Sequence, residues 1–596
     1  MLISFNSSAL FSSEEAGLEL EINKTISDEG LVGIVWSTVS NDVASVGSAG
    51  FSDTSKRTLM SHSHKVNVGS VTKTVLAAGV MRLITQGEIT PETNVEKLLP
   101  QLGFNNPWRD TAPITVETLL EHTAGLDNIR MWQFLNTAPE PDTPLENAFP
   151  SQANELLKVR SKPGTQYSYS NMGYALLAMV IETITGERYE DYLEEQLLAP
   201  LGMQDSTFHF VSQTGKYKDE MLAMGYFENN VPQTSVPIYL RPAGQFSTTA
   251  LDMAKFMLFL LGNGQLYGKP FIRPELMNMI GVPNNTDAKN KGLEIGHGLA
   301  LAARDRHGVV GFCHPGTTFG FRAYICLFPE DKKAFFYAIN ADVETSNYEK
   351  FNEILINHLA LKNADPVKAE RQVANLSKVE GIYVPSPNNM AEFEWLDMMF
   401  NFKWLVAKNN KVIIKSLQND DRELLPLNSN LFRASDRTQV SHVIFIQDHS
   451  TLLSDGLQTY KKESIAMMLV YWCSLILGCL GLIYILLVGV FRSITRRTVG
   501  LKAILWPFLN ILAFSIPVYL YGNQSFLKFG ELTSASSALA VLSGLLPVTL
   551  LLSVFLALKN KAKSNQTRRD IVALLALTQC CLVLASRDVI PIVFWT

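Results

Sequence analysis

The sequence has few of the features that mark nucleic-acid-binding, disulfide-rich or metal-dependent proteins. Its formal net charge is only −5 over 596 residues, and no basic run occurs before the last part of the chain, so we expect no nucleic-acid partner. Only six cysteines are present, and four of them lie in strongly apolar stretches, which argues against a disulfide framework. His62 and His64 form an isolated pair without a third ligand nearby, so we predict no metal site and no cofactor.

Cys313 and Cys326 are the two cysteines outside the apolar tail. In an oxidising compartment they would face each other across a hairpin. The favoured interpretation is nevertheless a pair of buried free thiols on neighbouring strands.

Long apolar runs are confined to the last quarter of the chain. Each can cross a hydrocarbon core of about 30 Å, which takes roughly 20 helical residues. Trp472, Tyr521 and Trp595 lie near their ends, where aromatic side chains anchor helices at the membrane surface. We therefore predict a membrane domain over residues 464–596, with helices near 465–491, 503–521, 536–558 and 571–595.

The charges between these runs predict the orientation, because Lys and Arg accumulate on the cytoplasmic side of a membrane. The second loop has only Lys528 beside Glu531, as an outward loop should. The first and third loops are basic, through Arg492, Arg496, Arg497, Lys502, Lys559, Lys561, Lys563, Arg568 and Arg569. We expect a multi-pass protein of the cell membrane whose soluble part lies on the extracytoplasmic side, periplasmic or extracellular. Because residues 1–16 contain no export signal, we expect a leader upstream of this sequence.

The soluble part divides into two predicted domains, residues 1–362 and 370–462. The second is a small β domain with short alternating segments, such as residues 411–415 and 443–446. Asn409-Asn410 between two alternating runs is a hairpin signal. The polar stretch between the two domains is typical of a linker.

The first reactive motif is Ser70-x-x-Lys73, at the start of an apolar helical pattern that ends at Gly87. Residues three apart share a helix face, so the Lys73 amine would stand one turn from the Ser70 hydroxyl. The helix N-terminus favours developing negative charge, and burial would lower the pKa of Lys73 enough for it to accept a proton. Taken alone, such a pair is more often a helix cap with an exposed lysine.

The second and third motifs carry polar groups in two further segments. Tyr169 and Asn171 lie on a turn before an apolar helix, where a phenol can relay a proton and an amide can bind a substrate. His314, Gly316 and Thr317 lie between two apolar segments that read as strands. Gly316 would let a substrate approach the strand edge, and the Thr317 and Ser70 N–H groups would form an oxyanion hole.

In this order, the three motifs resemble the class C β-lactamase, D-alanyl-D-alanine peptidase and esterase family of serine hydrolases, over roughly residues 15–360. Further family landmarks are residues 119–126, 200–203, 243–248 and 296–299. The resemblance implies an α+β fold, with an antiparallel sheet flanked by helices and a helical subdomain. It also implies that the second domain is a small lipocalin-like barrel.

The roles implied by the resemblance are Ser70 as nucleophile, Lys73 and Tyr169 as general base and acid, and Asn171 as substrate-positioning residue. His314 stands where the β-lactamases carry a lysine that pairs with the substrate carboxylate. Because neutral imidazole attracts a carboxylate weakly, a peptidase or esterase is favoured over a β-lactamase.

Three functional hypotheses follow. The first is a membrane-anchored hydrolase that cleaves a small-molecule or peptide amide or ester and also contacts membrane lipid. The second is a sensor or binding protein, in which the cleft captures a cell-wall or peptide ligand and the helices pass the signal inward. The third, a transporter or channel, is disfavoured because Arg587 and Asp588 are the ionisable residues that the sequence puts near a span.

Overall fold

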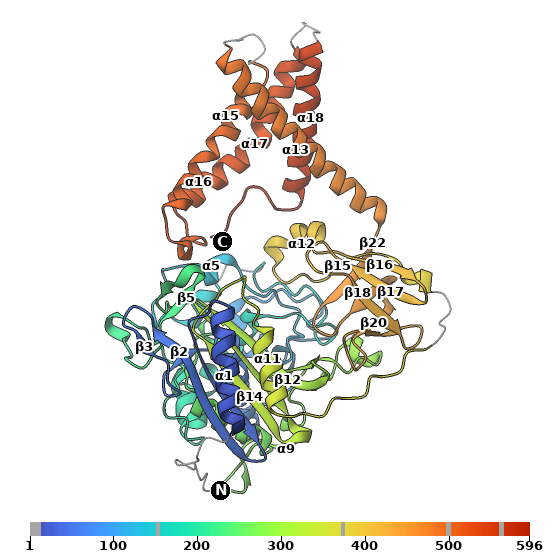
Figure 1. The fold of residues 1–596 in the computed structure, drawn as a ribbon. Helices are drawn as coiled ribbons and strands as arrows, with labels where there is room; N and C mark the ends of the chain where they lie inside the picture. The colour runs from blue at the N-terminus through green and yellow to red at the C-terminus, as the bar shows by residue number, and fades with distance from the viewer. Residues whose placement is uncertain (1–12, 151–154, 371–375, 496–501, 560–564, 596) are drawn as a thin grey trace.

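The structure is a computed structural model that describes residues 13–150, 155–370, 376–495, 502–559 and 565–595. Along the chain, a mixed α/β body is followed by a closed β-barrel and then by a group of long apolar helices (Figure 1). Residues 1–12 lie outside the described part, so the upstream leader stays an expectation. Arg496, Arg497, Lys561 and Lys563 lie outside it as well.

An eight-stranded antiparallel sheet forms the centre of the body. In the middle of the sheet, a strand from the start of the body's sequence pairs with one from its end: β1 pairs with β14, and Ile34 faces Ile339. In spatial order the strands are β10 (Gly296–His297), β11 (Ala302–Arg306), β12 (Val309–Thr318), β13 (Phe321–Phe328), β14 (Lys333–Ile339), β1 (Gly33–Ser40), β2 (Val43–Asp53) and β3 (Thr58–Leu59).

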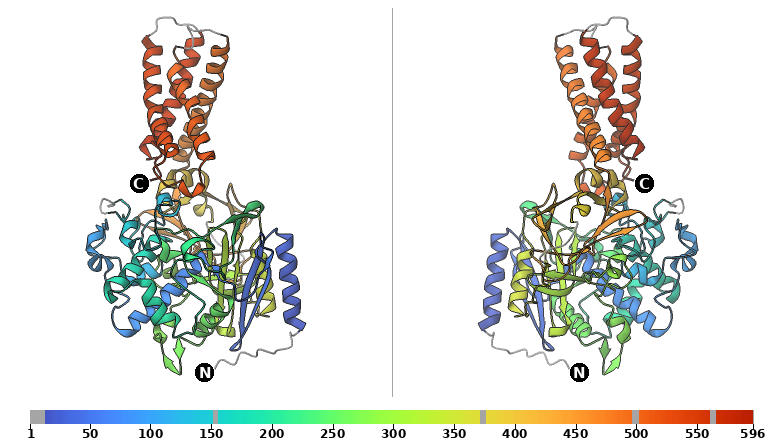
Figure 2. Two further views of the ribbon diagram at one scale, coloured as in Figure 1. Left: turned by 90° about the vertical axis from the view of Figure 1, so that its left-hand side faces the viewer. Right: turned by 90° about the vertical axis from the view of Figure 1, so that its right-hand side faces the viewer.

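Helices cover both faces of this sheet. On one face α1 (Ser13–Asp28) and α11 (Glu349–His358) bury their apolar sides in one cluster with β13 and β14 (Figure 2). On the other face lies α8 (Ala250–Leu261), followed by α2 (Thr72–Gln86) and α6 (Asn171–Thr185) in the larger core. Helix α6 is apolar around almost its whole circumference because it is buried from all sides. The sheet and the helical part meet at the start of α2, where Gly69 lies against Thr317 of β12.

The second part is a closed antiparallel barrel of eight strands, in which β22 pairs back with β15. The predicted hairpin is confirmed, since Asn409 and Asn410 both have positive φ between β16 and β17. A short helix, α12 (Glu394–Phe400), leaves the barrel after its first strand. The strands are β15 (Gly381–Pro385), β16 (Lys403–Lys408), β17 (Lys411–Lys415), β18 (Arg422–Pro426), β19 (Leu431–Ala434), β20 (His442–Gln447), β21 (Ser450–Ser454) and β22 (Thr459–Glu463).

Among the described residues of the last part, four helices are long and apolar enough to cross a membrane. They are α13 (Ile465–Ile494), the pair α15 (Leu505–Ala513) and α16 (Ser515–Gly522), α17 (Ser534–Lys559) and α18 (Asn565–Ser586). The second span is broken at Phe514 because Pro517 lacks the N–H that would bond to Ala513.

Two expectations for this part are corrected. The fourth span does not reach residue 595, because α18 ends at Ser586, before Asp588 with its positive φ and before Pro591. Arg492 is not a loop residue: it lies in the last turn of α13, is 1% exposed and forms a bidentate ion pair with Asp570 of α18, with both N···O distances at 2.9 Å. This arginine can be buried because a carboxylate from another helix pairs with its charge.

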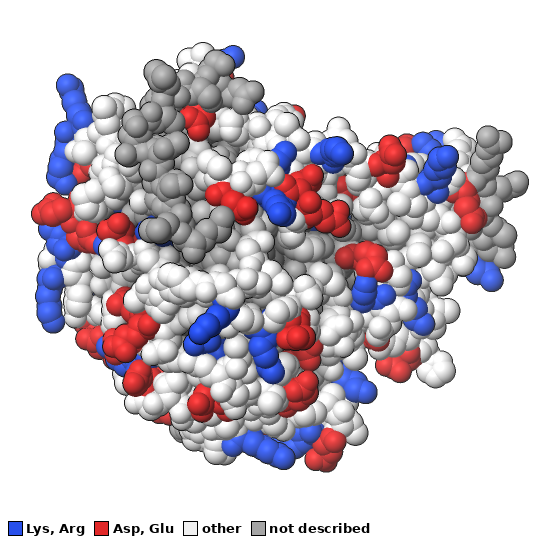
Figure 3. Space-filling model, turned by 90° about the horizontal axis from the view of Figure 1, so that it is seen from below, with Lys and Arg blue, Asp and Glu red and all other residues white. Residues whose placement is uncertain are grey.

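The face of the body that points away from the long helices carries both signs of charge. Figure 3 shows Lys and Arg interspersed with Asp and Glu over this face, without a field of one sign. The described residues on this face form no extended basic stripe.

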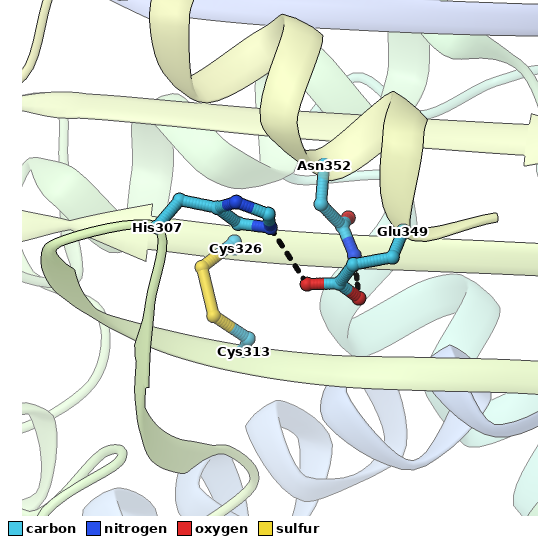
Figure 4. The surroundings of a disulfide bond; sticks show 5 residues. All are labelled: His307, Cys313, Cys326, Glu349 and Asn352. Carbon is cyan, nitrogen blue, oxygen red and sulfur yellow. Dashed lines mark hydrogen bonds and ion pairs between the residues drawn. A yellow bond between two sulfur atoms is a disulfide. The ribbon is translucent and has the colours of Figure 1, made fainter. Parts of the chain in front are cut away.

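The two cysteines of the body correct another expectation. Cys313 on β12 and Cys326 on β13 are direct partners across the hairpin, and their sulfurs are bonded. The interpretation as free thiols is therefore wrong, because the strand register puts the two side chains on the same face at the same level. Figure 4 shows the disulfide beside α11, whose Glu349 accepts hydrogen bonds from His307 and Asn352.

Candidate active site

The reactive serine lies at the entrance of α2. Residues Gly69–Val71 form a single 3-10 turn that continues into the helix, and the helix ends at Gly87 with a φ of 86°, as the pattern predicts. The preceding strand β4 (Val66–Asn67) pairs with β7 (Ser247–Thr248), which fixes the direction of approach. Ser70 is half-buried between the sheet and the helices.

Lys73 stands one helical turn beyond the serine, as predicted. Its Nζ donates to Ser70 Oγ over 2.9 Å and to the Ala243 carbonyl over 2.7 Å. The side chain is completely buried, and no carboxylate pairs with it in the described part of the chain. Burial alone lowers the pKa of Lys73 well below its ordinary value, because desolvation disfavours the ammonium form.

Tyr169 approaches the same hydroxyl from the segment before α6. Its phenol donates to Ser70 Oγ over 3.0 Å. Burial raises the pKa of Tyr169 to about 12, although the hydrogen bond to Ser70 opposes this shift, so the phenol stays protonated at neutral pH. The segment is held in place because Ser170 N donates to His122 Nδ1 over 3.0 Å, and Ser170 caps α6 by accepting from Gly173 N.

Asn171 begins α6 and belongs to a chain of three amides. Its Nδ2 donates to Asn128 Oδ1 over 2.7 Å, and Asn128 Nδ2 donates to Asn389 Oδ1 over 3.1 Å. Asn389 comes from the barrel, in the loop after β15. The barrel therefore contributes Asn389 to the amide chain that holds Asn171.

The third motif forms the far end of β12. Pairing with β11 stops at Cys313, so the segment 314–318 extends beyond that neighbour and runs beside the serine turn. A Cβ added to Gly316 would lie 2.0 Å from the Val68 carbonyl oxygen, and one added to Gly69 would lie 2.4 Å from Thr317 N. Both glycines are needed for the close approach of the two backbones. The need for glycine at position 316 is therefore explained by contact with the protein's own backbone, rather than by the approach of a substrate.

His314 is buried and belongs to a cluster of three histidines with His122 and His297. One ring nitrogen from each lies within 4.8 Å of the others, as in a metal site. His122 Nδ1 accepts an N–H, so its Nε2 carries the proton, whereas the Nδ1 atoms of His297 and His314 face carbonyls at 2.6 Å. The neutral cluster thus offers two lone pairs and one N–H, and the Nε2 atoms of His122 and His297 have no hydrogen-bond partner among the described residues.

The structure brings all seven predicted site residues into one region, with Ser70, Lys73 and Tyr169 in direct contact. Sequence reasoning missed the Ala243 carbonyl, Asn128 and the barrel residue Asn389. The first lies in the segment 243–248, one of the family landmarks of the sequence. Nothing in the sequence around Asn128 or Asn389 indicates that they meet.

Known proteins resemble the chain over its soluble part. Residues 22–357 match the Beta-lactamase family. Protein flp of Staphylococcus aureus (strain MW2) is 26% identical over 328 residues, which are 52% of this chain and 60% of that protein. Penicillin-binding protein 4 of Amycolatopsis lactamdurans is 26% identical over 304 residues, which are 48% of this chain and 75% of that protein. A crystal structure of SurE has 18% identity and a TM-score of 0.52, and covers 76% of this chain and 99% of that chain, a likeness of fold.

Proposed function

The chain belongs to the Beta-lactamase family, and from this premise we propose that it is a membrane-anchored serine hydrolase that forms an acyl-enzyme on Ser70. The observation that carries the proposal is the contact of one hydroxyl with two proton-handling groups. Ser70 Oγ lies 2.9 Å from the Lys73 amine and 3.0 Å from the Tyr169 phenol. A buried lysine without a carboxylate partner is neutral more readily and can accept the serine proton.

In the proposed reaction, Ser70 Oγ attacks the carbonyl carbon of an amide or ester while its proton passes to Lys73. The N–H groups of Ser70 and Thr317 stabilise the oxyanion of the tetrahedral intermediate. Tyr169 gives a proton to the leaving amine or alcohol and regains one from Lys73. Water then attacks the acyl-enzyme by the reverse path, which releases the acid and restores the serine.

We propose a peptidase or esterase rather than an efficient β-lactamase. The pKa of His314 lies well below its ordinary value because of burial and of the neighbouring His297, so the imidazole carries no charge toward a substrate carboxylate. We expect poor turnover of nitrocefin, measured by its absorbance change. Rapid nitrocefin hydrolysis would contradict this assignment of the substrate class.

The test of the hydrolase proposal uses p-nitrophenyl acetate and a D-amino-acid amide with the full-length protein in detergent. Ser70→Ala is expected to abolish turnover of whichever substrate is cleaved, and the exposed-serine control Ser63→Ala to retain it. Turnover that survives in Ser70→Ala would exclude Ser70 as nucleophile. Ligand binding without any turnover would favour the sensor alternative.

We also propose that the body and the barrel lie on the extracytoplasmic side of the cell membrane. The first support is the position of Lys559 and Arg569 at the ends of α17 and α18 far from the body, because basic residues accumulate on the cytoplasmic side (Figure 1). The second support is the disulfide, which persists in oxidising compartments. Tyr267 is 79% exposed on the body, so a Tyr267→Cys variant is expected to react with a membrane-impermeant maleimide in intact cells. Labelling only after lysis would place the body in the cytoplasm.

A further inference from the structure

The loop between α16 and α17 is docked on the body beside α5 (Met131–Phe134) (Figure 1). In this docking loop, residues 525–531, Gly530 N donates to the Leu135 carbonyl over 2.8 Å. A Cβ added to Gly530 would lie 2.4 Å from Trp132 Cα, so this close contact needs glycine. The membrane unit thus meets the body through a specific backbone contact, which a simple tether does not need.

Glu531, at the end of the docking loop, joins the body to the third span. Its Oε1 accepts from Thr137 N at 2.6 Å and from Thr137 Oγ1 at 2.5 Å. Its carbonyl accepts from Ser536 Oγ over 2.7 Å, and Ser536 lies in the first turn of α17. The position of α17 is therefore linked to the body through a single residue with contacts on both sides.

Phe526 and Leu527 form the apolar side of the docking loop. Leu527 is 8% exposed and belongs to one cluster with Ile238 and Phe319. The ring centroid of Phe526 lies 5.5 Å from that of Phe227 and 6.0 Å from that of Phe319. Both side chains of the loop are therefore part of the apolar surroundings of Phe319.

Phe319 lies in the short turn between β12 and β13, close in sequence to the proposed oxyanion hole. On its other side the ring of Phe134 is stacked on it, with the centroids 4.5 Å apart. Thr317, whose N–H would bind the oxyanion, precedes Phe319 by two residues, so their Cα atoms are at most about 7 Å apart. A shift of this turn therefore changes the position of the Thr317 N–H relative to Ser70.

We propose that the docking loop is a positioning element of the reactive site, which holds the turn at Phe319 and thereby the Thr317 N–H beside Ser70. The inference rests on the proposed hydrolysis, in which this N–H stabilises the oxyanion. Loss of one oxyanion-hole donor lowers kcat by about 10²–10³, so a partial misplacement has a measurable effect. The second and third spans thus contribute to the reaction in addition to anchoring the chain, for which a single span suffices.

The test measures kcat and KM of the full-length protein in phospholipid nanodiscs, for whichever of p-nitrophenyl acetate and the D-amino-acid amide it cleaves. Phe526→Ala removes the ring beside Phe319 and is expected to lower kcat about tenfold, with KM within about twofold of the parent. Phe526→Leu keeps an apolar side chain there and is expected to regain most of kcat. Phe555→Ala, at a position on α17 that is 61% exposed, is the matched control and is expected to keep both parental values.

A second pair of variants tests the other end of the docking loop. Glu531→Ala removes the acceptor of both Thr137 hydrogen bonds and is expected to lower kcat a few-fold, whereas Glu531→Gln retains an acceptor oxygen and is expected to stay close to the parent. In each impaired variant, inhibition by phenylboronic acid should weaken by the same factor as kcat, because its tetrahedral adduct with a serine resembles the transition state. A purely structural role of the loop would lower the thermal midpoint without this parallel loss.

The outcomes separate the inference from its premise. Parental kcat and parental boronate inhibition in both Phe526→Ala and Glu531→Ala would overturn the positioning role and leave the hydrolase proposal intact. A change confined to KM or to the thermal midpoint would do the same. If the parent shows no Ser70-dependent turnover, the proposed hydrolysis fails and the inference fails with it.

Discussion

Lys73 beside Ser70 and Arg492 in the membrane unit are both buried basic side chains, and their surroundings differ. Arg492 is 1% exposed and is bound through two nitrogens by Asp570, which also accepts from the Tyr484 hydroxyl over 2.9 Å. Lys73 is equally buried, but its Nζ donates to a hydroxyl and a carbonyl and lies over the rings of Tyr169 and Tyr174, and no carboxylate among the described residues pairs with it. A matched carboxylate keeps a buried cation charged and structural, whereas a site without one favours the neutral base. We therefore expect Arg492 to contribute to stability and Lys73 to the proposed chemistry.

The largest expected effect comes from removing Lys73, the basic side chain without a carboxylate partner. Lys73→Met keeps the length of the side chain, and kcat/KM is expected to fall about 10³-fold or more because the serine loses its base. Thermal stability should stay equal or rise, since no buried amine remains. The matched control Lys216→Met, at an exposed position, should change neither quantity. An active Lys73→Met enzyme would break the comparison.

Removing the partner of the paired cation should affect stability instead. Asp570→Ala leaves the Arg492 charge buried, which costs about 3–5 kcal/mol in typical cases. Unfolding of the detergent-solubilised protein, followed by the thermal midpoint, measures the loss, and Asp588→Ala at an exposed position is the control. The double variant Arg492→Leu with Asp570→Leu should regain most of the stability. A single variant as stable as the parent would remove the contrast between the two sites.

The pH dependence of activity sharpens the comparison. Activity requires neutral Lys73, so kcat/KM should rise about tenfold per pH unit below the lowered pKa and level off well before 10.5, the ordinary lysine value. Between these two values the unfolded chain binds the additional proton, so the thermal midpoint of the parent should rise with pH relative to Lys73→Met. Rates that keep climbing to pH 10.5 would indicate an unshifted lysine.

The smallest expected effect lies between the barrel and the pocket. Asn389→Ala removes one acceptor from Asn128, and KM for an amide substrate should rise a few-fold, in line with about 1 kcal/mol for a hydrogen bond. Asn389→Asp retains the acceptor oxygen and should restore KM, while kcat changes little in either variant. Equal KM values in both variants would show that the amide chain does not position the substrate.

The sequence predicts those parts of the site that depend on local spacing. Ser70 and Lys73 share a helix face, and the confirmed family places Tyr169 beside them. The sequence alone does not reveal Asn389, which reaches Asn128 only because the barrel docks on the body. The same limit applies to the membrane unit, where Arg492 resembles a loop residue until Asp570, 78 positions later, is placed beside it. Long-range pairing also decides the state of Cys313 and Cys326, which depends on strand register.

The most direct test of the central claim is the mass of the protein after reaction with a fluorophosphonate. We predict one adduct per chain, located by peptide mapping on the peptide that contains Ser70. It should be absent from Ser70→Ala and form more slowly in Lys73→Met. An adduct on another residue, or equal labelling of Ser70→Ala, would contradict the assignment of Ser70 as the nucleophile activated by Lys73.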